Sequence, residues 1–418
     1  MIIIKKIVLF IWVAALFTAC ADRSSGQRDE VAKFVTISGQ DLITPSGEKL
    51  FIRGTNLGNW LNPEGYMFGF GKTNSARFIN EMFCQLVGPD ETAEFWKAFK
   101  ENYITRQDIE FIASTGANTI RLPFHYKLFT DEDYMGLTSN QDGFQRVDSV
   151  VTWCRDNGLY LILDMHDAPG GQTGDNIDDS YGYPWLLESE ASQQLFCNIW
   201  QKIADYYKNE PVILGYELTN EPIAPYFANV EELNAQLEPL YRRATQAIRQ
   251  VDQNHIILIG GAQWNSNFRP FKDGSYDDKL MYTCHRYGGE ATREAITGFI
   301  HFRDSVNLPM YMGEIGHNSD EWQAAFSQVM QESNIGYTFW PYKKLDGSCM
   351  MGIQRPANWD LIVKFAESPR TTYQEIREAR PDQEMARQAM KEFIENCKCH
   401  NNVPQESYIR SMGLNVQR

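Results

Sequence analysis

Two stretches decide the fold of this chain: 212–222, Val-Ile-Leu-Gly-Tyr-Glu-Leu-Thr-Asn-Glu-Pro, and 308–314, Leu-Pro-Met-Tyr-Met-Gly-Glu. Each contains a short apolar run bounded by Pro or Gly and ends at or near a carboxylate, Glu221 or Glu314. Such runs are typical of buried parallel strands. In a barrel of parallel strands, the carboxyl ends of the strands form the active site, so we expect both carboxylates in one cleft.

Strand-like runs recur eight times and alternate with amphipathic stretches typical of helices. The predicted strands are 51–56, 118–122, 159–165, 213–218, 255–260, 280–285, 309–314 and 335–340. The predicted helices are 106–115, 144–157, 189–207, 230–251, 290–305 and 320–331, with 359–366 closing the ring. This rhythm predicts an α/β fold, a (β/α)8 TIM barrel. An N-terminal β-hairpin over 34–53 and a short C-terminal helical extension, with a helix over 381–397, are expected beside it.

The first residues have the pattern of a targeting segment. Lys5 and Lys6 precede an apolar run over 7–16, which is too short to span a bilayer as a mature helix. Residues 17–20, Phe-Thr-Ala-Cys, resemble a bacterial lipobox, which predicts a lipoprotein signal peptide over 1–20 and lipidation of Cys20. A plain secretory signal is the alternative. Either way we expect an exported protein, here a lipoprotein that is membrane-anchored and faces the periplasm or the cell exterior.

The rest of the chain shows no internal linker. We expect a tether over 21–33, the barrel domain over 34–370 and the helical extension over 371–418. Two long loops, 59–104 and 168–185, would follow the first and third strands and wall the cleft.

The composition of the 418 residues restricts the class of protein. With 43% hydrophobic and 22% charged residues, the chain is expected to be globular. A formal net charge of -15 argues against nucleic acid as a partner and against electrostatic docking on anionic lipid, and favours a neutral substrate. The aromatic share of 13% suits a glycan binder, because sugar rings stack on aromatic faces, although large cores also use aromatic residues. We expect a monomer that needs no cofactor.

Two clusters raise the question of a metal site. Residues 397–400, Cys-Lys-Cys-His, lack a second ligand pair at zinc spacing. His166 lies between Asp164 and Asp167, but neighbours on a strand point to alternate faces. We therefore predict no metal, and we expect buried, unreactive thiols at Cys154, Cys197 and Cys284.

Most strand runs end in a polar or aromatic side chain that would converge on the cleft. In chain order these candidates are Arg121, His166, Asn220, Glu221, His285, Glu314 and Trp340. Arg121 could instead pair with a carboxylate inside the barrel, such as Glu217. Two carboxylates facing one another form the acid and nucleophile pair that glycosidic bond cleavage uses.

Seven strings occur in the order found in one family. They are 56–60 (Asn-Leu-Gly-Asn-Trp), 116–123 (Gly-Ala-Asn-Thr-Ile-Arg-Leu-Pro), 163–166 (Leu-Asp-Met-His), 220–222 (Asn-Glu-Pro), 285–287 (His-Arg-Tyr), 313–316 (Gly-Glu-Ile-Gly) and 339–340 (Phe-Trp). Together they resemble glycoside hydrolase family 5, retaining glycosidases on (β/α)8 barrels. Residues 164–172 also resemble its β-glucanase branches, including exo-acting 1,3-glucanases, but depart from them at Asp167, where a small residue is more usual.

The resemblance implies a role for each carboxylate. Glu314 would be the nucleophile, kept ionised by Arg121 and receiving a hydrogen bond from Tyr287. Glu221 would be the general acid and then the general base, with a pKa raised by limited solvent and by the charge of Glu314. The retaining mechanism requires the two carboxyl groups about 5–5.5 Å apart.

The remaining implied roles concern the substrate. Asn220 would bind the sugar 2-hydroxyl, His166 and His285 would hold hydroxyls or orient the acid, and Trp340 would form the stacking floor. Outer stacking platforms are expected at Trp60, Tyr66 and Trp185.

The leading hypothesis is a retaining β-glycoside hydrolase that cleaves β-linked glucans or β-glucosides by double displacement. The alternatives are a catalytically inactive, lipid-anchored glycan-binding protein on the same barrel, a β-mannan- or glycolipid-directed glycosidase, and a metal-dependent hydrolase. No motif determines the sugar, the linkage or endo versus exo action.

Overall fold

The structure of the protein is a computed structural model, and it describes residues 33–136 and 139–416. The predicted signal peptide, Cys20 and all but the last residue of the predicted tether lie outside the described residues. Within the described ranges, no helix has both the length and the apolar composition that crossing a membrane requires.

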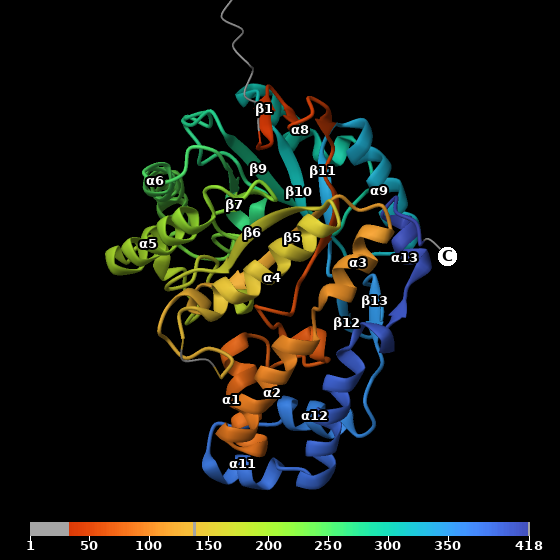
Figure 1. The fold of residues 1–418 in the computed structure, drawn as a ribbon. Coiled ribbons are helices and arrows are strands. Elements are labelled where there is room, and N and C mark those ends of the chain that lie inside the picture. Colours follow the sequence, from red (N-terminus) through yellow and green to blue (C-terminus); the bar gives the residue numbers. More distant parts are fainter. Residues whose placement is uncertain (1–32, 137–138, 417–418) are drawn as a thin grey trace, which may run out of the picture.

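Eight parallel strands close into a barrel (Figure 1). Around the barrel the order is β10, β11, β4, β5, β6, β7, β8 and β9, so that strands consecutive in the barrel sequence are neighbours. Each predicted strand overlaps one barrel strand, which confirms the (β/α)8 TIM barrel. The bounds are β4 (Arg53–Asn56), β5 (Thr119–His125), β6 (Tyr160–Asp167), β7 (Ile213–Glu217), β8 (Ile256–Gly260), β9 (Leu280–His285), β10 (Met310–Gly316) and β11 (Gly336–Trp340).

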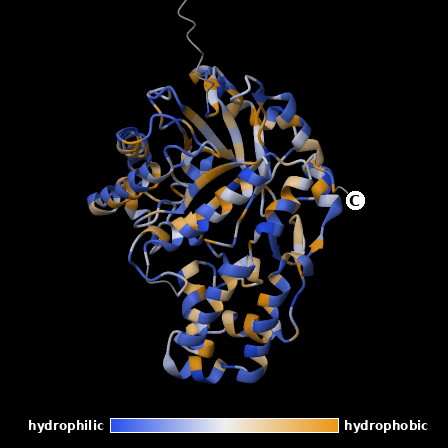
Figure 2. Ribbon diagram, viewed as in Figure 1, coloured by the Kyte–Doolittle hydropathy of each residue, from blue (hydrophilic) through white to orange (hydrophobic). Residues whose placement is uncertain are grey.

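Helices cover the outside of the barrel. Figure 2 shows largely hydrophobic strands and helices of mixed character, as expected when strands are buried on both faces and helices on one. The surrounding helices are α3 (Arg106–Ser114), α4 (Asp142–Asp156), α5 (Glu190–Tyr207), α6 (Val230–Arg249), α8 (Thr297–Val306) and α9 (Asp320–Glu332). The helix predicted over 290–305 begins later, after the 3-10 turn η5 (Glu294–Ile296). Between β8 and β9 the only helix is the short α7 (Ala262–Asn265).

A small antiparallel sheet closes the amino end of the barrel. It contains β1 (Thr36–Ser38), β2 (Asp41–Ile43) and β3 (Lys49–Leu50), so the predicted hairpin is present with a third strand added. Leu42 and Leu50 pack against residues at the starts of barrel strands, such as Ile162 and Leu214.

The stretch 59–104, predicted as a long loop, is largely helical. It contains η1 (Gly65–Phe68), α1 (Ala76–Val87) and α2 (Pro89–Asn102). Gly88, at a φ of 94°, ends α1, and Pro89 starts α2, where its missing N–H costs nothing.

Beneath the barrel in Figure 1, α1 and α2 form a helical layer with α10 (Trp359–Glu367), α11 (Tyr373–Ala379) and α12 (Gln383–Cys397). Its core is aromatic. Phe393 stacks on Trp359 with ring centroids 4.5 Å apart and on Phe68 at 5.4 Å. The C-terminal extension therefore packs against the segment that follows the first barrel strand. The domain boundary at residue 370 stays a prediction.

The predicted closing helix over 359–366 forms as α10, but it lies in the helical layer because Trp359 packs against Phe70 and Phe393. The place beside β11 is taken by α13 (Glu406–Ser411). This helix packs on α9, and the ring of Tyr408 lies 6.0 Å from that of Phe339. A second small sheet joins β12 (Lys343–Leu345), β13 (Met351–Ile353) and β14 (Val403–Pro404).

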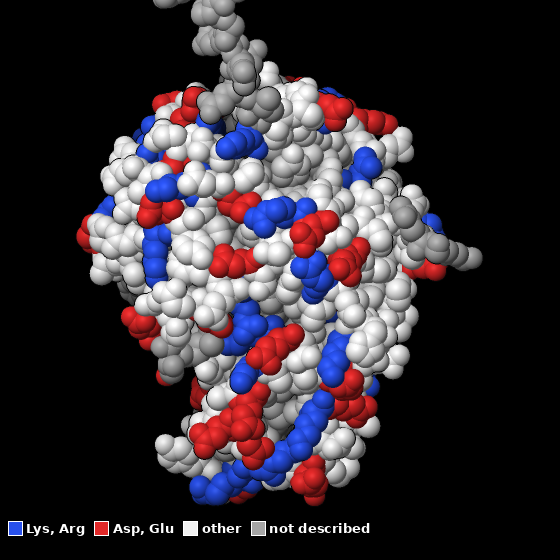
Figure 3. All heavy atoms as spheres, in the orientation of Figure 1, with Lys and Arg blue, Asp and Glu red and all other residues white. Residues whose placement is uncertain are grey.

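Four short 3-10 turns complete the secondary structure of the described residues: η2 (Tyr126–Phe129), η3 (Asn176–Asp178), η4 (Trp185–Leu187) and η6 (Cys399–Asn401). On the face shown in Figure 3, acidic and basic side chains are intermixed, and neither sign forms one continuous patch there.

Candidate active site

A cleft of about 410 Å³ lies at the carboxyl ends of the barrel strands. Six of the predicted site residues line it: His166, Asn220, Glu221, Tyr287, Glu314 and Trp340. The long loops contribute as expected, with Glu64 and Tyr66 from the segment after β4 and Ile177 from the segment after β6. A larger hollow of about 610 Å³ lies on the outside of the barrel, between the β8–β9 connection and α8, and contains none of these residues.

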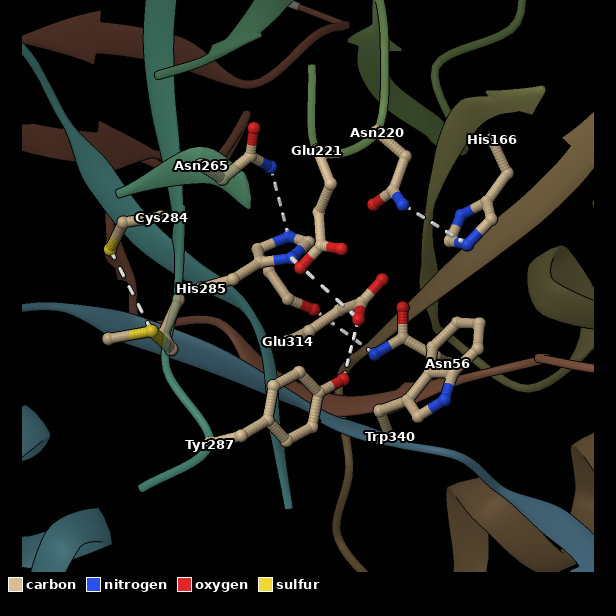
Figure 4. A network of polar contacts seen from close by, with 12 residues as sticks. Asn56, His166, Asn220, Glu221, Asn265, Cys284, His285, Tyr287, Glu314 and Trp340 are labelled. Atoms are coloured by element: carbon tan, nitrogen blue, oxygen red, sulfur yellow. Dashed lines mark hydrogen bonds and ion pairs between the residues drawn. The ribbon is translucent and has the colours of Figure 1, made fainter. Parts of the chain in front are cut away.

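Glu314, in β10, is held by two donors. Arg121 Nη1 donates to Glu314 Oε1 at 2.7 Å. The hydroxyl of Tyr287 donates to Glu314 Oε2 at 2.5 Å, as Figure 4 shows. Glu314 is 4% exposed. Both donors were predicted from the sequence, and each bonds to a different oxygen of the carboxyl group.

Arg121, in β5, is completely buried and contacts three acidic side chains. Besides Glu314, its guanidinium binds Glu217 in a bidentate pair at 2.7 and 3.1 Å and lies 3.0 Å from Asp164 Oδ2. It also donates to Asn220 Oδ1 at 2.9 Å. The two pairings considered for Arg121, with Glu217 and with Glu314, therefore occur together. Its guanidinium holds β6, β7 and β10 in place relative to one another.

Glu221 follows β7 and contacts His285. Burial lowers the pKa of His285 to about 4, so its imidazole is neutral. Asn265 Nδ2 donates to His285 Nε2 at 3.1 Å, so the ring proton is on Nδ1, which donates to Glu221 Oε1 at 2.8 Å.

Burial raises the pKa of Glu221 to about 7, as the sequence predicted. The second predicted cause, the charge of Glu314, stays a prediction. The charge of Arg121 lowers this pKa, and the carboxylate of Asp175 raises it further.

The two carboxyl groups face one another. One oxygen of Glu221 and one of Glu314 lie within 4.8 Å of each other and of a His285 nitrogen. Among the described residues, Glu221, His285 and Glu314 are the one group of three side chains whose ligand atoms lie close enough together to hold a metal ion. The positive guanidinium of Arg121, which pairs with Glu314, would repel a metal ion bound between these three side chains.

Asn220 and His166 form one hydrogen-bonded unit beside Trp340. Asn220 Nδ2 donates to His166 Nε2 at 3.2 Å, and His166 Nδ1 donates to Asp164 Oδ2 at 2.7 Å. Burial lowers the pKa of His166 to about 4, so this ring is neutral too. The ring of Trp340 stacks on that of His166, with centroids 5.2 Å apart and planes 5° apart. Among the described residues, the amide nitrogen of Asn220 has this one hydrogen-bond partner.

Of the three aromatic residues expected as outer stacking platforms, one lines the cleft and two do not. Trp60 is 1% exposed, and its indole N–H donates to the carbonyl of Lys100, so it has no face open to a sugar. Trp185 is 46% exposed but does not line the cleft. Tyr66 lines the cleft, and its hydroxyl accepts a hydrogen bond from Trp340 Nε1 at 2.6 Å.

The two clusters considered as metal sites, around His166 and over 397–400, do not bring their ligand atoms together. Asp164 faces Arg121, whereas Asp167 Oδ1 lies 4.0 Å from His125 on the other side of β6. No group that includes Cys397, Cys399 or His400 has three ligand atoms this close among the described residues. The expectation of buried thiols is confirmed for Cys154, Cys197 and Cys284.

Sequence reasoning missed several residues of the site. Glu64 and His317 line the cleft, and Asn265 orients His285. Burial, followed by the charges of Glu314 and Glu221, raises the pKa of Glu64 well above its ordinary value. Glu64 and Asn265 lie several residues beyond the end of a strand, and His317, which directly follows β10, lies three residues past the predicted run 309–314, so no local pattern identified them.

Comparisons with known proteins agree with this geometry. The family model Cellulase (glycosyl hydrolase family 5) matches residues 82–346. A β-xylosidase of Phanerodontia chrysosporium is 30% identical over 256 residues, 61% of this chain and 52% of that protein, so the chain spans about half of that relative. Endoglucanase C of Acetivibrio thermocellus is 26% identical over 330 residues, 64% of this chain and 92% of the relative. The crystal structure of a β-glucanase from Saccharophagus degradans shares the fold, with a TM-score of 0.52, 19% identity, and coverage of 87% of this chain and 94% of that one.

Proposed function

Since this chain belongs to glycosyl hydrolase family 5, we propose that it is a retaining β-glycosidase that cleaves the O-glycosidic bonds of β-linked glucans or β-glucosides. The observation that carries the proposal is the pair of carboxyl groups, Glu221 and Glu314, with oxygens within 4.8 Å of each other in one cleft. Retaining enzymes place these groups about 5–5.5 Å apart, whereas inverting enzymes leave about 6.5–9.5 Å for a water molecule.

The proposed reaction has two steps. In the first, the carboxylate of Glu314 bonds to the anomeric carbon as the bond to the glycosidic oxygen breaks, and Glu221 gives its proton to that oxygen. In the second, Glu221, now ionised, takes a proton from water. The water oxygen bonds to the anomeric carbon, and the ester to Glu314 breaks. A pKa of about 7 suits Glu221 to both roles near neutral pH.

The neighbouring side chains suit a sugar at this carbon. The free amide hydrogen of Asn220 is available for the 2-hydroxyl, a contact that strengthens in the transition state. Trp340, fixed by its stacking on His166, offers an aromatic floor to the ring. Arg121 and Tyr287 supply charge and a hydrogen bond to the nucleophile before the reaction begins, so little reorganisation is needed.

The relatives' names favour neutral sugars. One is a β-xylosidase and another an endoglucanase, and a chain with a net charge of -15 would repel an acidic polysaccharide. We therefore place β-linked glucose polymers and glucosides first. Mannans and glycolipids are the other substrates to test. An inactive glycan-binding barrel is not favoured, because both carboxylates keep the partners that their chemistry needs.

The test combines a substrate screen with two variants. β-1,3-, β-1,4- and β-1,6-glucans, mannan, xyloglucan and aryl β-glucosides and β-xylosides are assayed, and the anomer formed first is identified by NMR. Glu314→Ala and Glu221→Ala should each lower turnover by several orders of magnitude, and azide should restore turnover in Glu221→Ala as a β-glycosyl azide. An inverted first product, or normal rates in either variant, contradicts the proposal. Loss of activity in chelator would instead support the metal-dependent hydrolase.

We also propose that the protein is exported and anchored through a lipid on Cys20, because residues 1–20 resemble a lipoprotein signal peptide. Expression of the full chain and of Cys20→Ser, followed by membrane fractionation and mass spectrometry of the mature N-terminus, tests this. An unlipidated N-terminus in the unsubstituted chain would support a plain secretory signal. Sedimentation of the purified protein tests the proposed monomer.

A further inference from the structure

Glu221 lies on a turn whose backbone is strained. The φ angles of Glu221 and Ile223 are 44° and 60°, in the left-handed region. This region is unfavourable for residues with a side chain, and for a β-branched residue such as Ile223 it is rare. Strained backbone persists only where its surroundings impose it, so other groups must hold this turn in place.

The segment after β6 provides these groups. The side chain of Gln172 is completely buried, and its Nε2 donates to the carbonyl oxygens of His166 at 2.6 Å and Asn220 at 2.8 Å. Its Oε1 accepts from the backbone N–H of Ala168 at 2.9 Å. One amide thus ties the end of β6 to the residue immediately before Glu221.

Thr173 holds the next part of the turn. Its hydroxyl, on a completely buried side chain, donates to the carbonyl oxygen of Glu221 at 2.7 Å. On the backbone, Ile223 N–H donates to Gln172 O at 2.9 Å and Ala224 N–H donates to Thr173 O at 3.0 Å. Thr173 therefore binds one strained residue, Glu221, and Gln172 binds the other, Ile223.

Gln172 and Thr173 together form a clamp on the turn, and this clamp is held in turn by Asp178. Asp178 Oδ2 accepts from the backbone N–H groups of Thr173 at 2.6 Å and Gly174 at 2.8 Å. Gly174 has a φ of 84°, and a Cβ there would lie 2.5 Å from the ring of Phe227, so only glycine fits. The clamp therefore has little freedom to follow the turn if a contact is lost.

We propose that Gln172 and Thr173 are positioning residues that fix the carboxyl group of Glu221 for proton transfer to the leaving group. The proposal rests on the role of Glu221 proposed above. Neither residue lines the cleft, so each acts through the backbone of Asn220 and Glu221. A displacement of about 1 Å in a reacting group can cost about 100-fold in rate.

The experiment uses a series of aryl β-glycosides of the preferred sugar, from 2,4-dinitrophenyl to phenyl. A dinitrophenolate leaves without protonation, whereas a phenolate needs the acid, so a misplaced acid lowers kcat/KM selectively for the phenyl glycoside. Thr173→Val removes the hydroxyl at nearly constant volume, and Thr173→Ser keeps it. Thr115→Val is the matched control, because the Thr115 hydroxyl also donates to a backbone carbonyl, that of Ile112 at 2.7 Å, at the end of α3.

For Thr173→Val we expect kcat/KM to fall about 10- to 100-fold on the phenyl glycoside and less than about 3-fold on the dinitrophenyl glycoside. Thr173→Ser and Thr115→Val should change neither value by more than about 3-fold. Gln172→Asn, which keeps an amide but shortens its reach, should give the same selective loss and serves if Thr173→Val does not fold.

Equal losses on both substrates in Thr173→Val and Gln172→Asn, together with a selective loss in Glu221→Ala, would overturn the clamp and leave the proposed function standing. If Glu221→Ala itself shows no leaving-group selectivity, the proposed function fails and the clamp fails with it.

Discussion

The hydrogen bond from Tyr287 to Glu314 gives the sharpest quantitative prediction. The tyrosine hydroxyl lies 2.5 Å from Glu314 Oε2, and the carboxylate is 4% exposed. Tyr287→Phe removes this hydroxyl and keeps the ring. Hydrogen bonds to charged groups contribute about 1.5–3 kcal/mol, which corresponds to about a 10- to 150-fold loss in kcat/KM if the bond holds the nucleophile in the reactive geometry.

The assay is steady-state hydrolysis of an aryl β-glycoside by the purified protein, with thermal unfolding measured on the same samples. Tyr206→Phe is the matched control. Its hydroxyl also donates to a carboxylate, Asp148 Oδ2 at 2.9 Å, but on the outside of the barrel between α5 and α4. We expect Tyr206→Phe to keep normal kinetics. A loss of less than about 3-fold in Tyr287→Phe, with its fold intact, would refute the view that this bond positions the nucleophile.

Three further predictions follow from the same geometry. Gly58→Ala should raise KM more than it lowers kcat, because a Cβ at Gly58 would lie 2.8 Å from the ring of Trp340 and displace the stacking floor; unchanged KM would contradict this. With a phenyl leaving group, kcat/KM should fall as pH rises through about 7, because burial raises the pKa of Glu221 to about 7 and the acid loses its proton above that value; a plateau to pH 9 would argue against this acid. Phe393→Ala should destabilise the protein by about 3–5 kcal/mol, because the ring is fully buried against Trp359, and denaturant unfolding measures this; an unchanged midpoint would show that the helical layer is not part of the cooperative unit.

The sequence by itself determined the barrel and the pair of carboxylates at its rim. Eight apolar runs of strand length, separated by amphipathic stretches, have one common closed arrangement, and closure brings the carboxyl ends of all strands to one rim. Glu221 and Glu314 follow directly from this, since each comes at or just after the end of a strand. Among the predicted partners, His285 ends β9, Tyr287 follows it two residues later and Arg121 lies within β5, and the structure brings all three to the two carboxylates.

The tertiary structure decided what depends on contacts between distant segments. Phe393 and Phe68 meet in an aromatic core that no local pattern encodes. The packing of Trp359 on Phe393 places α10 in the helical layer. Asn265 reaches His285 from a connection without strand periodicity. Hydrogen bonds from Gln172 and Thr173 hold the left-handed backbone at Glu221. These two residues lie on the loop after β6, which comes close to Glu221 only when β6 and β7 have paired. Local periodicity determines which face of a strand or helix a side chain lies on. The residue that it contacts there depends on how the barrel closes and how the other segments pack around it.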